Sequence, residues 1–136
     1  MKNNQNQQVV SSIIVFNKKL LLLLRDNSPG IRDPECWQLP GGVVEGNETI
    51  SEAIRRELLE EIGITPKNIN YLTNPYPNIH IFYIPLTEKE TTKIKKGDEG
   101  TDLRFFSLDE IANIPLTQKL QHTIKNQKEL LDSLLS

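Results

Sequence analysis

The stretch GGVVEGNETISEAIRRELLEEIGI, residues 41–64, decides the fold of this sequence. Its second half predicts a helix that begins after Thr49, where Glu52 completes a capping box, and that ends at Gly63. Apolar residues recur every three or four positions along it, which is the pattern of a helix with one face in a protein core. These residues are Ile50, Ala53, Ile54, Leu58 and Ile62.

Three glutamates, Glu57, Glu60 and Glu61, crowd the end of this predicted helix. At about 100° per residue, Glu57 and Glu61 fall within the apolar stripe. A carboxylate that is buried without a partner costs several kcal/mol unless it binds a proton. A divalent cation would remove this cost, and carboxylates at positions i, i+3 and i+4 offer it hard oxygen ligands. The spacing therefore predicts a Mg²⁺ site, which Mn²⁺ would also suit. The alternative interpretation is a solvated, glutamate-rich helix face.

The loop before the helix is rich in glycine. Gly41, Gly42 and Gly46 let the backbone come close to a ligand and adopt positive φ. Together with the acidic helix they indicate a pocket for a metal ion and phosphate groups. Arg56 lies among the glutamates, and we expect it to form a structural salt bridge with the helix or the preceding loop.

The rest of the chain predicts an α/β fold with a mixed β-sheet covered by helices on two faces. Two β-rich runs, residues 9–16 and 20–25, form a hairpin through Asn17 and Lys18. Next come a loop over residues 26–35, a short strand over 36–40 followed by a turn at Gly41 and Gly42, and two strands within 69–86 that prolines break. A charged loop over 87–100 leads to a strand over 103–108 and a short helix over 107–114. One amphipathic helix over 116–134 ends the chain.

Length and composition fit one domain. The chain has 136 residues and a formal net charge of -2, so we expect a single domain over residues 9–136 and a flexible polar segment over residues 1–8. The sequence has no stripe of basic residues that would indicate binding to nucleic acid. The apolar runs near the N-terminus are far shorter than a helix that spans a membrane. The single cysteine, Cys36, is typical of the reducing cytoplasm, where we place the protein.

Residues 42–64 resemble the Nudix box, and residues 9 to about 134 resemble a small, MutT-like member of the Nudix hydrolase family, with its α/β/α sandwich. The fixed positions of the box are filled by Gly42, Glu48, Arg56, Glu57, Leu58, Glu60, Glu61, Gly63 and Ile64. The resemblance implies Mg²⁺-dependent hydrolysis of a nucleoside diphosphate linked to another group. The substrate is then a small nucleotide, and the protein is a monomer or a homodimer.

The resemblance also assigns roles to residues. It implies that Glu57, Glu60 and Glu61, with Gly41, bind the metal, and that Glu48 pairs with Arg56. Glu57 and Glu60 are accordingly catalytic. A third catalytic residue, the general base, would be Glu99 in the charged loop, with Asp98 and Asp102 as alternatives.

Substrate preference is less constrained. The resemblance places Arg25, Gly42 and Thr117 at the substrate, and Thr117 stands where relatives that act on oxidised guanine nucleotides carry an Asn. Aromatic residues either stack on a base or pack in the core; these are Trp37, Tyr76, Phe82 and Tyr83. The substrate that we expect is a nucleoside triphosphate, which is cleaved to a nucleoside monophosphate and pyrophosphate. The alternatives are ADP-ribose, a nucleotide sugar, a dinucleoside polyphosphate, or a Nudix-like sensor without catalysis.

Overall fold

The computed structural model describes residues 7–136, except for the side chains of residues 73–76. Within these residues, seven strands form one sheet, and five helices lie around it. The strands are β1 Val9–Phe16, β2 Lys19–Leu24, β3 Trp37–Gln38, β4 Gly41–Val43, β5 Asn70–Tyr76, β6 Ile79–Pro85 and β7 Asp102–Phe106. The helices are α1 Ile50–Ile62, α2 Glu88–Thr91, α3 Leu108–Ile111, α4 Gln118–Asn126 and α5 Lys128–Leu135.

The hairpin of β1 and β2 forms as predicted. Its two turn residues, Asn17 and Lys18, have φ values of 52° and 61°. Positive φ at both positions matches the right-handed twist of the flanking strands. Val15 pairs with Leu20, and Phe16 pairs with Lys19.

The sheet is mixed, and β1 organises it. β1 runs antiparallel to β2 and to the short β4, and parallel to β6. β2 also pairs with β3 and β7, while β5 pairs with β6 at the other side of the sheet. This arrangement places the loop after β2, the strand β4 and the residues after β3 next to one another.

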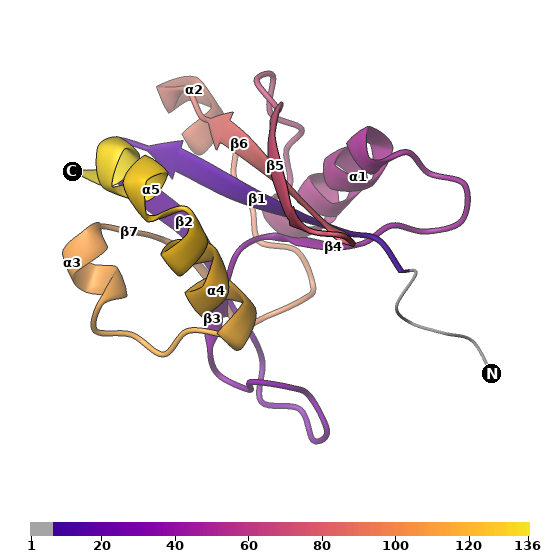
Figure 1. Ribbon diagram of the computed structural model, residues 1–136, viewed down its shortest axis with the longest axis horizontal. Helices are drawn as coiled ribbons and strands as arrows, with labels where there is room; N and C mark the ends of the chain where they lie inside the picture. Colours follow the sequence, from indigo (N-terminus) through magenta and orange to yellow (C-terminus); the bar gives the residue numbers. More distant parts are fainter. Residues whose placement is uncertain (1–6) are drawn as a thin grey trace.

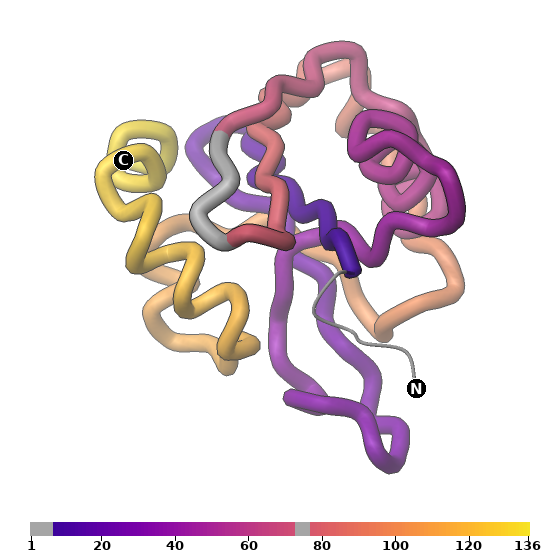
Figure 2. Tube along the Cα trace, turned by 45° about the vertical axis from the view of Figure 1, so that its right-hand side comes forward, coloured from indigo at the N-terminus to yellow at the C-terminus, as the bar shows by residue number. Residues whose placement is uncertain are grey.

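Helices cover both faces of the sheet, which confirms the predicted α/β/α sandwich (Figures 1 and 2). On one face, Ala53, Ile54 and Leu58 of α1 are fully buried against Ile14 and Leu21. On the other face, helices α3, α4 and α5 bury an apolar layer against the same strands. The residues at its centre are Ile13, Leu20, Leu22, Phe106, Ile111, Leu120, Leu131 and Leu135.

Three predictions of secondary structure were wrong. Gly41 and Gly42, predicted as a turn, form β4, since their backbone pairs with Val10 and Ser11. The charged loop contains the one-turn helix α2, which Thr87 caps. The single C-terminal helix is two helices, because Gln127 has φ -112° and ψ 27°. The chain changes direction at this break (Figure 1), and Leu131 and Leu135 of α5 lie in the core.

The N-terminal end of the described chain is held by side-chain contacts. Gln8 donates from Nε2 to Asn78 at 3.1 Å, and its Oε1 lies 2.6 Å from Nε2 of His80. Its carbonyl also accepts from the Val44 amide at 2.9 Å. Residues 1–6 lie outside the described part of the chain, so the flexibility expected there stays a prediction.

Within residues 7–136, no helix combines the length and the apolar character needed to cross a membrane.

Candidate active site

Helix α1 brings two of the three crowded glutamates into the interior, as its periodicity predicts. Thr49 and Glu52 form the capping box, and Gly63 ends the helix with φ 78°. Glu57 is 8 % exposed and Glu61 only 2 %. Glu60 lies on the outer side, with its side chain 57 % exposed. The helix therefore presents one deeply buried carboxyl group, one covered group and one exposed group.

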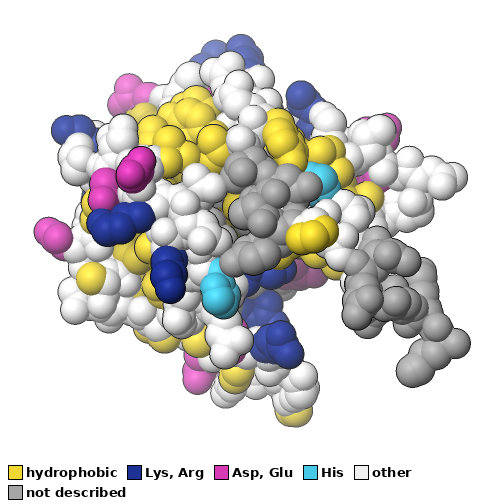
Figure 3. Space-filling model, in the orientation of Figure 1, with side chains coloured by type: hydrophobic (Ala, Val, Ile, Leu, Met, Phe, Trp, Pro, Cys, Tyr) yellow, Lys and Arg dark blue, Asp and Glu magenta, His cyan; other side chains and the backbone are white. Residues whose placement is uncertain are grey.

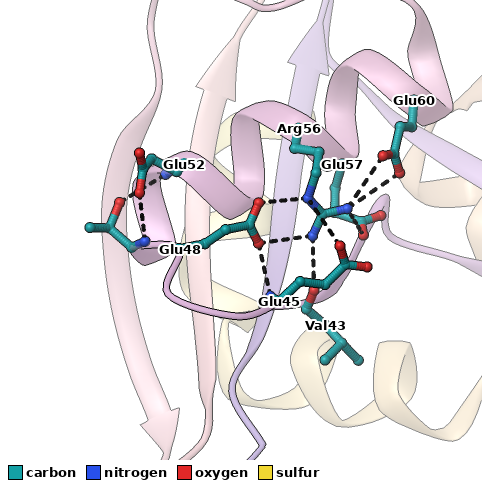
Figure 4. A network of polar contacts seen from close by, with 8 residues as sticks. Val43, Glu45, Glu48, Glu52, Arg56, Glu57 and Glu60 are labelled. Carbon is teal, nitrogen blue, oxygen red and sulfur yellow. Dashed lines mark hydrogen bonds and ion pairs between the residues drawn. The ribbon is translucent and has the colours of Figure 1, made fainter.

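Arg56 ties the loop before α1 to the helix (Figure 4). Its Nε lies 2.6 Å from Oε2 of Glu48, and its Nη1 lies 2.9 Å from Oε1 of Glu57. The guanidinium also donates to the carbonyl of Val43 at 3.0 Å and lies 3.4 Å from Glu60. Hydrogen bonds from Arg56 lower the pKa of Glu48. The predicted pairing of Arg56 with Glu48 is thus present, and the same guanidinium also contacts Glu57 and Glu60.

Burial and charge act against each other at Glu57. Desolvation raises the pKa of its carboxyl, while the hydrogen bond and charge of Arg56 lower it, and burial outweighs the arginine. Gly42 lies directly over this carboxyl group. A Cβ at position 42 would stand 2.5 Å from Cδ of Glu57, so any larger residue would force this carboxylate to shift.

Glu61 has no cation beside it. Within the described residues it forms no ion pair, and the Gly41 amide donates to its Oε1 at 2.8 Å. Burial first, and then the nearby carboxylates of Glu57 and Glu99, raise the pKa of Glu61 to about 9, although the Gly41 hydrogen bond lowers it. At neutral pH and without a cation, this carboxyl group keeps its proton.

The loop that carries Glu99 is anchored to the end of α1. The Lys95 amide donates to the Ile62 carbonyl at 2.8 Å, and the Gly97 amide donates to the Glu61 carbonyl at 3.1 Å. Nζ of Lys96 donates to the carbonyls of Gly97 and Gly100 at 2.6 and 3.1 Å. These bonds hold the loop against the helix, with Glu99 close enough to Glu61 to affect its pKa.

A pocket of about 360 Å³ opens beside these groups. This volume is within the range of small-molecule sites. The predicted site residues that line it are Arg25, Gly41, Gly42, Glu61, Glu99 and Thr117. Four other predicted residues, Glu48, Arg56, Glu57 and Glu60, do not line it, because they lie in the Arg56 network.

The carboxylates suit a hard divalent cation in chemistry and position, but they are not preassembled. Within residues 7–136, no three acidic, histidine or cysteine side chains are grouped as a metal site. Glu57 is turned toward Arg56, and Glu60 extends toward solvent. Glu61, buried at the pocket wall without a cation, is the group that fits a metal ligand best.

Sequence reasoning missed several polar residues of the pocket wall, among them Arg32, Asp33, Gln38 and Lys119. Asp33 Oδ2 accepts from the Gln118 amide at 3.0 Å across 85 positions of sequence. Such a distant contact has no local sequence signal. Two aromatic candidates are core residues, since Trp37 is 7 % exposed and Phe82 is 4 % exposed.

Two further candidates for contact with a base have different outcomes. Tyr83 is half-buried and packs beside the apolar core, and it does not line the pocket. The side chain of Tyr76 lies outside the described residues. Thr117 lines the pocket, where its hydroxyl caps α4 by accepting from the Leu120 amide at 3.2 Å.

The NUDIX domain model matches residues 6–127, so the chain belongs to the Nudix family. The ADP-ribose pyrophosphatase of Methanocaldococcus jannaschii is 34% identical to it over 112 residues, which are 77% of this chain and 64% of that protein. The chain thus spans less than two thirds of the length of that relative.

Solved structures show the same fold. The MutT NUDIX hydrolase from Burkholderia pseudomallei matches with a TM-score of 0.70 at 23% identity, over 88% of this chain and 95% of that one. The NUDIX domain of Shewanella oneidensis NrtR, complexed with ADP ribose, matches with a TM-score of 0.72 at 19% identity, over 96% and 90% of the two chains.

Proposed function

We propose that this protein hydrolyses the pyrophosphate bond of a nucleoside diphosphate linked to another group, with Mg²⁺ as cofactor and Mn²⁺ as a substitute. The observation that carries the proposal is the Glu61 carboxyl group, which is 2 % exposed at the pocket wall and forms no ion pair with any described Lys or Arg side chain. Membership of the Nudix family supports it, as does 34% identity to an ADP-ribose pyrophosphatase.

Glu57, Glu60 and Glu61 would hold the metal, next to Gly41 at the pocket wall. The metal, when bound, supplies positive charge that stabilises the phosphate oxygens of the transition state. Glu61 has to lose its proton to act as a ligand, and a nearby cation favours that loss. Glu60 is free to turn inward because its side chain is 57 % exposed.

Glu99 would act as the general base. Its carboxylate takes a proton from the attacking water as the water oxygen bonds to phosphorus. The bond from phosphorus to the bridging oxygen breaks, and the leaving phosphate keeps the electron pair. Of the three acids considered for this role, Glu99 alone lines the pocket. Asp98 does not line the pocket, and Asp102 pairs with Arg104 at 2.6 Å.

The group linked to the diphosphate has two candidates. The first is a further phosphate, as in a nucleoside triphosphate. Arginine and lysine side chains in the pocket wall support it. The second is ribose, as in ADP-ribose, and identity to the M. jannaschii enzyme favours it.

A panel of nucleoside triphosphates, ADP-ribose and nucleotide sugars tests the proposal. We expect phosphate-containing products only when Mg²⁺ or Mn²⁺ is present, identified by liquid chromatography. Glu60→Gln should lower kcat at least about 100-fold, because it removes a charged ligand. Glu129→Gln, at an exposed position of α5, is the matched control and should keep wild-type activity.

Two results would overturn the proposal. One is a wild-type protein that binds nucleotides with Mg²⁺ and cleaves none of them, which is the behaviour of a sensor. The other is Glu60→Gln with the activity of the wild type.

A further inference from the structure

The pocket has a cationic side, which we define as Arg25, Arg32 and Lys119. All three line the pocket, and none forms an ion pair with another described residue. Nε of Arg25 donates to the Arg32 carbonyl at 2.8 Å, and its Nη1 donates to Gln38 at 2.9 Å. Both partners are neutral, so the guanidinium keeps its positive charge uncompensated.

Lys119 is the most informative member of this group. The residue as a whole is exposed on α4, yet protein atoms surround its ammonium closely enough to lower its pKa. Desolvation is the main cause, and the charge of Arg25 adds to it. Within the described residues, no carboxylate pairs with the Lys119 ammonium. Such a placement is unfavourable unless a ligand supplies negative charge.

One acid shares this part of the wall. Asp33 lines the pocket, but its Oδ2 already accepts from the Gln118 amide at the start of α4. Figure 3 shows Lys and Arg side chains (dark blue) gathered where Figure 1 places the start of α4 and β3. Positive charge therefore exceeds negative charge on this side.

The carboxylate side of the same pocket consists of Glu61 and Glu99. The charges that shift the pKa of Glu61 belong to Glu57 and Glu99, and the charge that shifts the pKa of Lys119 belongs to Arg25. A ligand that fills the pocket thus meets carboxylates in one part and free cations in another.

We propose that Lys119 and Arg25 form a phosphate-binding subsite for a phosphate group beyond the bond that is cleaved. This inference rests on the proposed function and narrows its substrate to nucleotides with an additional phosphate, such as nucleoside triphosphates. Lysine and arginine are the residues that bind phosphate by charge-assisted hydrogen bonds. A neutral sugar at this place would leave both cations without compensation.

Lys119 could instead read a base, because lysine also donates to purine O6 and N7 atoms. The two interpretations differ in what they require of the ligand. A phosphate subsite responds to phosphate without a base, whereas a base-reading lysine responds to the base and ignores additional phosphates.

Binding of inorganic tripolyphosphate in EDTA separates them. Without a divalent cation the carboxylate side offers the anion no positive charge, so calorimetric binding reports the cationic side. We expect Lys119→Met to weaken binding about tenfold or more, and Lys119→Arg to restore it. Lys125→Met, an exposed position on the same helix that does not line this pocket, should bind as the wild type does.

Hydrolysis gives a second measurement when the wild type is active. For ATP, Lys119→Met should lower kcat/KM about tenfold or more, while for ADP-ribose it should change kcat/KM less than about twofold. These substrates share a base and differ in the additional phosphate.

The inference is wrong if Lys119→Met binds tripolyphosphate as tightly as the wild type, or if Lys125→Met loses as much affinity. Equal losses of kcat/KM for ATP and ADP-ribose would also overturn it. A protein that cleaves no nucleotide but loses tripolyphosphate binding with Lys119→Met would refute only the proposed function.

Discussion

Glu48 and Glu61 belong to the same short stretch of sequence, yet the protein treats their charges in contrasting ways. Glu48 lies 2.6 Å from Arg56, whose hydrogen bonds lower its pKa. Glu61 is buried with an amide as its hydrogen-bond partner, and its pKa rises to about 9. The carboxylates around Arg56 have a positive partner within the protein, while the carboxyl group of Glu61 gains one only when a cation binds. Residues near one motif can therefore serve stability and chemistry separately.

The largest expected effect separates the two glutamates directly. Glu61→Gln should lower kcat/KM by about 1000-fold, because the amide cannot supply the charge that a metal requires. At neutral pH its melting temperature should stay near that of the wild type, since Glu61 is already protonated there. Glu48→Gln should do the reverse, with a lower melting temperature and a much smaller kinetic loss. Similar profiles for the two variants would contradict the comparison.

The second prediction concerns pH in the absence of divalent cations. The folded pKa of Glu61 is raised from 4.5 to about 9, so the folded state binds more protons than the unfolded state between these values. The stability that this group contributes is full below pH 4.5 and is lost as pH rises toward 9. We expect urea midpoints of the wild type to fall over this window relative to Glu61→Gln. Added Mg²⁺ should reverse the fall.

Removing the central cation of the other region gives the third prediction. Arg56→Met leaves Glu48 and Glu57 without their partner, and it should lower the free energy of unfolding by roughly 2 kcal/mol. Arg56→Lys should recover only part of this, because lysine lacks the forked geometry. Arg55→Met, one position earlier and exposed, is the control. Urea unfolding measures all three, and equal stabilities would show that the network contributes nothing.

The smallest expected effect is at Lys96, which positions the loop of Glu99. Lys96→Met removes two hydrogen bonds to loop carbonyls and should lower kcat about tenfold while KM stays constant. A loop that still folds but holds its base less well should also shift the pH profile of kcat. Lys93→Met, at an exposed position nearby, should leave both unchanged. A loss in KM alone would contradict a positioning role.

Sequence periodicity was enough to place Glu57 and Glu61 inside the protein, because a helix repeats every few residues and its apolar stripe is visible locally. It could not show Lys119 beside Arg25, since that neighbourhood depends on how α4 lies against the loop after β2. The same limitation hid β4, because its glycines read as a turn until their pairing with β1 is known.

The C-terminal region shows another limit. Leucines at helical spacing predicted one helix, yet Gln127 interrupts it without any proline or glycine. Leu120 of α4 and Leu131 and Leu135 of α5 lie in the same buried apolar cluster on either side of the break, and the spacing of the leucines carries no local signal for it.

The attachment of the Glu99 loop has a consequence for engineering. Main-chain amides of Lys95 and Gly97 hold the loop to α1, and a Cβ at Gly97 would stand 1.8 Å from the Glu60 carbonyl oxygen. Position 97 therefore requires glycine, whereas the exposed positions 98 and 99 contribute none of these anchoring hydrogen bonds. The backbone of the loop should therefore keep its position when Glu99 is replaced by histidine or when the acidic residue is moved to position 98.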